Sequence, residues 1–297
     1  MIRHLTLALA ATTAFASAST AELRETARKL SDSHKDAVVW LSVLAKTTMG
    51  AEGEVPAQIK TMLAAQDKEE KSEVTGTVID ASGLIVTALG GLDKSSMVDG
   101  QTVNTAMGPI KLKASSEFKE IKVITADGSE VPADLVMKDE DLGLAFIKVR
   151  SDSEEAKGVE FKAIDLADSA PGALLDECIA LGRLDESLNR EPSLLTTEIS
   201  GLTVRPRMFY RVNTDAIGCP VFLASGKLLG ISVLRHPKGG SARNGQLQVS
   251  PVILPAADVA KIAAQAKEAK PAAPAPAPVA EAPAAEEKPA EEKPAGE

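Results

Sequence analysis

Short hydrophobic runs separated by turn sequences fill most of the chain between residues 74 and 253. In the first group, from Val74 to Val149, apolar runs such as IKVIT and LAFIKV alternate with the turn sequences DASG and ADGS. Runs of this kind, rich in β-branched residues and bounded by Gly, Asp and Ser, are typical of β-strands. A second group extends from about 173 to 253. Two successive groups of short strands with few helices predict an all-β chain of two packed β-barrels.

Helical patterns flank these two groups. The segment 19–35 carries apolar residues at helical spacing, which predicts a short N-terminal helix. The segment 255–267 predicts a second helix, with Pro in its first turn. The run AVVWLSVLA at 37–45 indicates a buried strand. After this strand, the segment 47–73 is expected to be a surface insertion whose helix begins near Pro56.

The N-terminus has the features of an export signal. Arg3 supplies a positive charge, LTLALAATTAFA supplies an apolar run, and Ala16-Ser17-Ala18 fits a cleavage site of small residues. The apolar run is shorter than the ~20 residues that span a bilayer, so a cleaved signal peptide over 1–18 is preferred to a membrane anchor. The mature protein is therefore expected to be periplasmic or secreted, without an integral membrane segment.

The C-terminal sequence differs in composition from the rest of the chain. Residues 268–297 consist almost entirely of Ala, Pro, Glu and Lys. Such a segment does not bury enough apolar surface to offset the entropy lost on ordering, so a disordered, solvated tail is expected. The folded domain is then expected at 36–267, with a first barrel at about 36–150, a second barrel at about 160–253 and the closing helix.

Charge, cysteine and histidine content narrow the possible functions. The net charge is −9, and Lys and Arg are not gathered along the sequence, which argues against nucleic acid or an anionic membrane as partner. Cys178 and Cys219 allow at most one disulfide in an exported protein. His34 and His236 are far apart in the sequence and lack partners at ligand spacing, so no metal or other cofactor is expected.

Four stretches of the sequence resemble one family, and they occur in that family's order. They are GTVIDASGLIVTALGGL, VITADGSEVPADLVMKDEDLGLAFIKV, CIALGR followed by TTEISGL, and NTDAIGCPVFLASGKLLGISV. Together they are similar to the trypsin-like serine proteases, and among these to the bacterial HtrA/Deg-type periplasmic proteases. The resemblance covers about 36 to 267. It implies two six-stranded antiparallel β-barrels with short N- and C-terminal helices, and a peptide-binding cleft between the barrels.

The resemblance places all three catalytic positions on residues that lack the required chemistry. In this family a Ser attacks the peptide carbonyl, a His accepts its proton, an Asp orients the His, and backbone N–H groups stabilise the oxyanion. The motifs T-N-x-H and L-A-V-L-K-V put the His position at Gly90 and the Asp position at Gly143. The motifs T-D-A and G-G-P leave Ile217 at the Ser position, and the loop that shapes the oxyanion hole has no counterpart.

Cys219 and Asp141 are the fallback candidates for catalysis. The sequence GCP resembles a contracted nucleophile motif, but a Cys nucleophile needs a base or a lowered pKa, and neither His34 nor His236 occupies the base position. We therefore expect Cys219 to be a buried core thiol. Asp141 lies two residues before Gly143 and shares its face in an extended strand, but the alignment needs no gap there. We expect Asp141 to belong to a solvated acidic turn.

The sequence thus predicts an exported pseudoprotease that binds a peptide or an envelope protein without cleaving it. The main alternative is an active endopeptidase with a rearranged site that depends on a serine or on Cys219. A third hypothesis is a structural envelope spacer in which the tail is the working part. The identity of the partner and the oligomeric state stay open.

Overall fold

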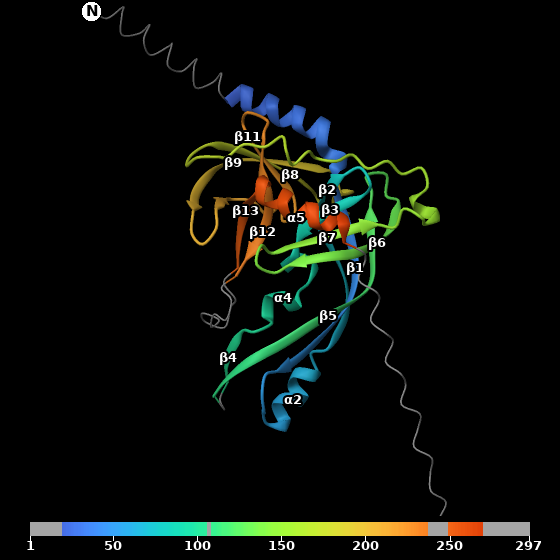
Figure 1. The fold of residues 1–297 in the computed structure, drawn as a ribbon, viewed down its shortest axis with the longest axis vertical. Helices are drawn as coiled ribbons and strands as arrows, with labels where there is room; N and C mark the ends of the chain where they lie inside the picture. The colour runs from blue at the N-terminus through green and yellow to red at the C-terminus, as the bar shows by residue number, and fades with distance from the viewer. Residues whose placement is uncertain (1–19, 106–107, 237–248, 270–297) are drawn as a thin grey trace, which may run out of the picture.

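The computed structural model of the chain describes residues 20–105, 108–236 and 249–269. Two closed, six-stranded antiparallel β-barrels make up its body, so the predicted fold class is confirmed (Figure 1). The expected signal peptide at 1–18 and most of the expected tail lie outside the described residues.

The first barrel has the strand order β1-β2-β3-β7-β6-β5 and closes through pairing of β1 with β5. A short seventh strand, β4 (Thr102–Thr105), extends this sheet beyond β5. Between β3 and β4 the chain forms two short helices, α3 (Leu89–Leu92) and α4 (Ser95–Val98). The six barrel strands are β1 (Val38–Ala51), β2 (Lys68–Asp80), β3 (Leu84–Ala88), β5 (Gly108–Ile124), β6 (Glu130–Asp139) and β7 (Leu144–Val149).

The second barrel has the strand order β10-β13-β12-β11-β8-β9. It is followed by helix α5 (Ala256–Glu268). Three 3-10 turns lie before, between and within the barrels, at Lys35–Ala37, Glu154–Ala156 and Glu186–Leu188. The strands of this barrel are β8 (Glu177–Arg183), β9 (Pro192–Thr203), β10 (Phe209–Val212), β11 (Pro220–Leu223), β12 (Leu228–Arg235) and β13 (Ser250–Pro255).

The segment 47–73 folds mainly as a continuation of the first barrel's strands, which differs from the expected insertion. The β1 strand was expected to end at residue 45, but its pairing with β5 continues to Ala51 opposite Leu112. Together with helix α2 (Ala57–Ala64), these extended strands form an arm that projects from the barrel (Figure 1). The arm has its own small core, in which Ile59, Leu63 and Ile110 are buried. This local burial explains why the strands continue beyond the barrel.

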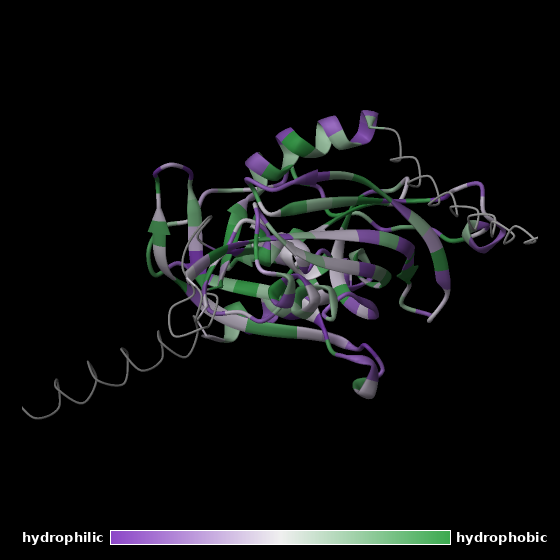
Figure 2. Ribbon diagram, turned by 90° about the horizontal axis from the view of Figure 1, so that it is seen from below, coloured by the Kyte–Doolittle hydropathy of each residue, from purple (hydrophilic) through white to green (hydrophobic). Residues whose placement is uncertain are grey.

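The two terminal helices cover the barrels and join them. Apolar residues of the helix over 20–34 and of α5 belong to one core cluster that also contains residues of both barrels. In Figure 2 the N-terminal helix carries both hydrophobic and hydrophilic residues, as expected for a helix with one buried face. At the far end of α5, Lys267 forms an ion pair with Asp80 of the first barrel, 2.7 Å apart. No helix within the described ranges is both long and apolar enough to cross a bilayer.

Both cysteines are free, buried thiols. Cys178 lies opposite Leu223 in the pairing of β8 with β11, whereas Cys219 lies four residues before Leu223 along the chain. Four residues of extended chain span about 13 Å, which exceeds the ~7 Å Cα separation that a disulfide tolerates. The single disulfide that the sequence allowed is therefore not formed.

Candidate functional site

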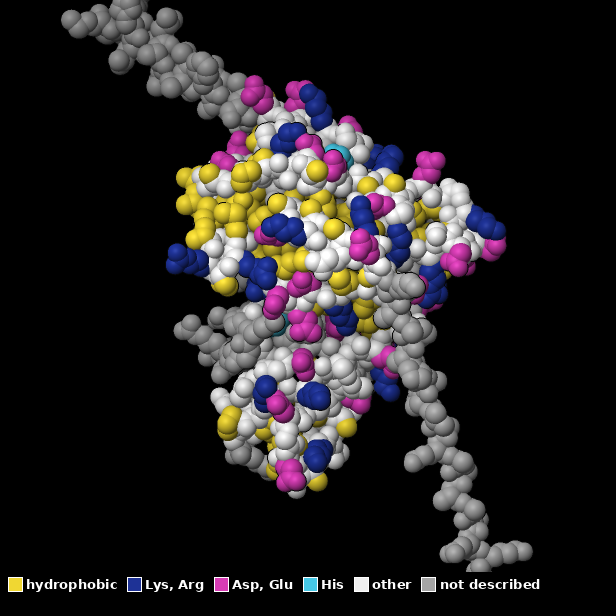
Figure 3. Space-filling view, in the orientation of Figure 1, with side chains coloured by type: hydrophobic (Ala, Val, Ile, Leu, Met, Phe, Trp, Pro, Cys, Tyr) yellow, Lys and Arg dark blue, Asp and Glu magenta, His cyan; other side chains and the backbone are white. Residues whose placement is uncertain are grey.

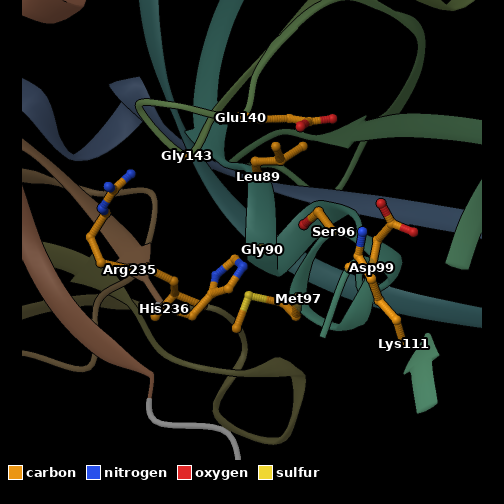
Figure 4. A pocket seen from close by; sticks show the side chains of 12 residues that line it. Leu89, Gly90, Ser96, Met97, Asp99, Lys111, Glu140, Gly143, Arg235 and His236 are labelled. Atoms are coloured by element: carbon orange, nitrogen blue, oxygen red, sulfur yellow. The ribbon is translucent and has the colours of Figure 1, made fainter. Parts of the chain in front are cut away.

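A pocket of about 450 Å³ lies between the two barrels. The first barrel lines it through α3, α4, β5 and the turn between β6 and β7, and the second barrel lines it through the end of β12 and the residue after it (Figure 4). Aliphatic and thioether groups mix with charged ones along its wall. The lining residues are Leu89, Gly90, Ser96, Met97, Asp99, Gly100, Lys111, Glu140, Gly143, Leu234, Arg235 and His236.

Two of the predicted site positions, Gly90 and Gly143, meet in this pocket. A Cβ atom on Gly90 would lie 2.5 Å from Sδ of Met97, so the thioether occupies the space beside this glycine. A Cβ atom on Gly143 would lie 3.1 Å from the carbonyl oxygen of Leu234, and Gly143 has a φ of +71°. The room beside both glycines is therefore already taken by neighbouring groups.

Ile217, the third predicted position, is not among the residues that line the pocket. Its carbonyl oxygen accepts a hydrogen bond from the Thr75 hydroxyl on the first barrel. The next carbonyl, that of Gly218, accepts a hydrogen bond of 2.8 Å from the Thr77 hydroxyl, which is buried. The threonines thus hold the Ile217–Gly218 segment against the wall of the first barrel.

The N–H groups of the same segment are also bonded within the protein. The Ile217 N–H donates to the carbonyl oxygen of Asp215 at 2.9 Å, and the Gly218 N–H donates to the carbonyl oxygen of Ser232 at 2.8 Å. An oxyanion hole requires N–H groups that face the position of the substrate carbonyl. Neither of these two donors meets that requirement in this arrangement.

Cys219 is fully buried, as expected from the sequence. Burial raises the pKa of its thiol to about 12, despite an opposing hydrogen bond from Thr75 and the charge of Arg183. A thiol with a raised pKa is a poor nucleophile at neutral pH.

His34 stacks on the ring of Phe222 with the ring centroids 5.5 Å apart, so its imidazole is engaged in packing.

Asp141 lies in an exposed turn beside the pocket and does not line it. Its backbone carbonyl accepts a hydrogen bond from the Arg235 guanidinium. The Arg235 guanidinium also lies over the ring of Phe209 on β10, 4.9 Å from its centroid. The turn is thus tied to the end of β12, which fixes one side of the pocket opening.

The buried carboxylate of Asp93 positions the α3–α4 segment that carries Met97. It accepts hydrogen bonds from the Ser95 hydroxyl at 2.6 Å and from the Ser95 N–H at 3.1 Å. It also forms an ion pair of 2.5 Å with Lys138, whose ammonium lies 4.7 Å from the centroid of the Phe118 ring. Burial by itself would raise the pKa of Asp93, but the hydrogen bonds from Lys138 and Ser95 outweigh it and the pKa is lowered.

Substituting Asp93→Asn is expected to reduce the free energy of unfolding at pH 7 by about 2 kcal/mol, because the Lys138 ammonium loses its buried partner. The lowered pKa gives the pH dependence. The ionised carboxylate stabilises the fold fully above its unfolded pKa of about 3.9, and this contribution is lost as the pH falls through the lower folded value. Urea unfolding of both proteins between pH 7 and pH 2 measures the difference, which should shrink below about pH 4.

Asp134→Asn is the matched control, because Asp134 pairs with Arg150 and the side chain of that arginine is 54% exposed. An exposed pair of this kind contributes only about 0.2–1 kcal/mol. If both substitutions reduced the free energy of unfolding equally, the claim that Asp93 positions the α3–α4 segment would be contradicted.

The end of β12 extends past β11 and lies beside the pocket. Ser232 exchanges hydrogen bonds with residues 218 and 219 on the β11 side, and β11 pairs with β12 only as far as Ile231. Backbone direction alternates along an antiparallel strand, so the N–H and C=O of Leu234 also face that side. Among the described strands, none pairs with Leu234 on that side, where its carbonyl oxygen instead lies against Gly143 of the first barrel.

The sequence did not single out several residues that form this pocket, notably Met97, Ser96 and Lys111. They come from the α3–α4 segment and the arm, and no local motif marks them. His236 was set aside because the resemblance does not place it at the base position, yet it lines the pocket beside Gly90 (Figure 4). Within the described ranges, no group of three or more His, Cys, Asp or Glu is arranged to hold a metal ion.

A double β-barrel with a pocket between the barrels defines the architecture of the trypsin-like peptidases. The sequence model of the trypsin-like peptidase domain matches residues 74–231, more than half of the chain. The chain therefore belongs to the trypsin-like peptidase domain family.

The chain is similar to the crystal structure of the MamO protease domain from Magnetospirillum magneticum in its apo form, with 16% identity and a TM-score of 0.43. The match covers 77% of this chain and 97% of that chain. No curated protein matches the sequence.

Proposed function

We propose that this protein is an exported pseudoprotease that binds an extended peptide segment of a partner protein in the cleft between the barrels and does not cleave it. The observation that carries the proposal is the bonding of the Ile217–Gly218 segment. Both of its N–H groups donate to carbonyls within the protein, and both of its carbonyls accept hydrogen bonds from threonines of the first barrel. A peptide carbonyl in the cleft therefore finds no oxyanion donor in this segment.

The chemistry of the other positions supports the same proposal. Gly90 and Gly143 have no side chain for proton transfer or for orienting a base, and the pKa of the buried Cys219 thiol is raised to about 12. An active endopeptidase that uses Cys219 would require this thiol to ionise at neutral pH and to reach the substrate. Complete burial of Cys219 argues against both steps.

The end of β12, which extends past β11, supports peptide binding. An extended peptide beside this end can accept a hydrogen bond from the Leu234 N–H, while alternate side chains enter neighbouring pockets. The pocket beside Leu234 has a volume of about 450 Å³, and Leu89 and Met97 give it an apolar wall that can hold one such side chain. This binding mode needs no catalytic residue.

The proposal is tested with the chain from residue 19 onward in two assays. Incubation with fluorescent casein and with a mixed peptide library should release no fragments, in wild-type protein or in Cys219→Ala. Fluorescence polarisation with a labelled peptide library should detect binding. Cleavage that disappears in Cys219→Ala would establish the endopeptidase instead.

Filling the pocket is expected to weaken peptide binding at least about tenfold. The filled pocket has no room for a peptide side chain, and the peptide main chain then does not pair beside it. Ser96→Trp is the filling variant, since Ser96 lines the pocket and is only half-buried. Ser151→Trp, in an exposed turn outside the pocket, is the matched control and should keep the wild-type affinity. If peptides bound both variants as tightly as wild type, the site would lie elsewhere.

A further inference from the structure

A second surface, made of residues that do not line the pocket, combines exposed aliphatic residues with arginines. It is formed by the β9–β10 hairpin and by the loop before β8. Its aliphatic members are unusually exposed for their type: Leu174 by 56%, Leu175 by 69%, Leu202 by 37% and Val204 by 63%. In Figure 3 hydrophobic side chains gather on this part of the second barrel, with Lys or Arg side chains at the edge of the patch.

The loop and the hairpin are joined directly. The Leu175 N–H donates to the carbonyl oxygen of Ile199 on β9 at 3.0 Å, and the Gly172 N–H donates to the hydroxyl of Tyr210 on β10 at 3.2 Å. Tyr210 in turn pairs with Leu202 across the hairpin. The exposed leucines of the loop therefore lie beside the hairpin as one continuous surface.

Leu175 has a φ of +69°, a left-handed conformation that large side chains rarely adopt. Gly or Asn would fill this position at a lower conformational cost. A leucine that is both exposed and in this conformation contributes little to the stability of the isolated domain. Its side chain is better explained by contact with something outside the chain.

The tip of the hairpin is basic, in contrast to the chain as a whole, while Glu198 on β9 and the opposing Glu177 on β8 are exposed beside the loop. Residues 201–213, GLTVRPRMFYRVN, contain three arginines and no acidic residue, while the whole chain has a net charge of −9. Arg205 and Arg207 are exposed at the tip beside Val204, and Arg211 is exposed on β10. Within the part of the chain that the structure describes, none of the three guanidinium groups has an ion-pair partner. Asp176, the acidic residue that follows Leu175, accepts a hydrogen bond from Ala173.

We infer that the end of the second barrel formed by residues 172–175 and 202–207 docks on an anionic lipid surface. Aliphatic side chains at loop tips enter the boundary between headgroups and acyl chains, and neighbouring arginines bind the headgroup phosphates. The expected export of the protein brings it beside such a membrane. The net charge of −9 argued against an anionic partner, but Arg205, Arg207 and Arg211 lie close together on this one hairpin.

The test uses the chain from residue 19 onward and sedimentation with large vesicles of phosphatidylcholine, with or without 30% phosphatidylglycerol. Binding is expected only with phosphatidylglycerol and should fall as salt is raised from 50 to 500 mM. Each arginine near an anionic surface contributes about fivefold to partitioning, so Arg205→Glu with Arg207→Glu should lower it by at least about thirtyfold. Val204→Asp should also reduce binding, because it removes an inserted aliphatic group.

Matched controls separate this surface from general charge effects. Arg24→Glu with Arg28→Glu makes the same charge change on the exposed face of the N-terminal helix, and Leu188→Asp changes a leucine that is 52% exposed elsewhere. Both should bind vesicles within about twofold of wild type. Circular dichroism and thermal melting verify that all variants are folded.

Equal losses in the hairpin and helix variants would overturn the inference, as would binding that does not depend on phosphatidylglycerol. Retention on an immobilised polyglutamate peptide without any binding to vesicles would also overturn it, and would indicate an acidic protein partner instead. None of these results depends on the pocket between the barrels, so the proposed peptide binding is tested separately.

Discussion

A variant that carries Gly90→His, Gly143→Asp and Ile217→Ser together is expected to remain without peptidase activity. The three side chains would supply a nucleophile, a base and an orienting carboxylate, but the Ile217 N–H stays bonded to Asp215 and the Gly218 N–H to Ser232. Loss of one oxyanion donor costs about 10²–10³ in kcat, and here both donors of the segment are engaged. Hydrolysis of fluorescent casein, compared with that by trypsin, measures the result.

Packing adds a second obstacle to this restoration. A side chain on Gly90 would meet Sδ of Met97 at 2.5 Å, so the new imidazole would have to displace the thioether. Adding Met97→Ala removes that contact and serves as the more permissive variant. Both versions are expected to stay inactive, since neither frees the N–H groups. Measurable cleavage by either one would show that the assignment of the oxyanion segment is mistaken.

The substitution Gly218→Ala is expected to lower the free energy of unfolding by about 3 kcal/mol or more. Gly218 has a φ of +80°, which costs a residue with a Cβ about 1–2 kcal/mol. The added Cβ would also lie 2.3 Å from the backbone oxygen of Thr75 and 2.9 Å from the Thr87 hydroxyl. Backbone cannot move aside as a side chain tip does, so overpacking adds about 1–3 kcal/mol. Urea unfolding measures the sum.

Gly226→Ala is a matched control for this prediction. Gly226 has a φ of +83°, close to that of Gly218, but nothing lies within 4 Å of the position of its Cβ. It should therefore show only the conformational cost of about 1–2 kcal/mol. Equal destabilisation in the two variants would mean that the contact between the Ile217–Gly218 segment and the first barrel contributes nothing. A larger loss in Gly218→Ala supports the threonine contacts as the feature that fixes this segment.

The two proposed surfaces have separate roles. The pocket and the end of β12 lie between the barrels and suit an extended peptide. The surface formed by residues 172–175 and 202–207 lies at one end of the second barrel and suits a layer of lipid headgroups. A protein with both would hold a peptide near a membrane surface. Ser96→Trp, and Arg205→Glu with Arg207→Glu, separate the two, because the single substitution leaves the hairpin unchanged and the double substitution leaves the pocket lining unchanged.

Much of the fold follows from local sequence. Runs of four to eight apolar, β-branched residues between Gly- and Asp-rich turns determine strands such as LAFIKV, because strand pattern and turn chemistry are local properties. The arm was harder to predict. The β1 strand continues beyond residue 45 through a stretch of mixed polarity, and only its pairing with β5 and the small core under α2 stabilise that extension.

Part of the candidate site also follows from the sequence, and part depends on the tertiary structure. The sequence by itself determined which chemical groups are present: glycine at positions 90 and 143, isoleucine at 217, and a cysteine without a neighbouring histidine. Only the tertiary structure decided that Gly90 and Gly143 meet Met97 and Leu234 in one pocket, and that hydroxyls of the first barrel hold the Ile217–Gly218 segment. The hydrogen bonds that hold this segment join residues up to 142 positions apart. The sequence gives the identity of each side chain directly. Hydrogen bonds and packing between the barrels depend on how the two barrels are placed relative to each other, and no local sequence pattern determines that placement.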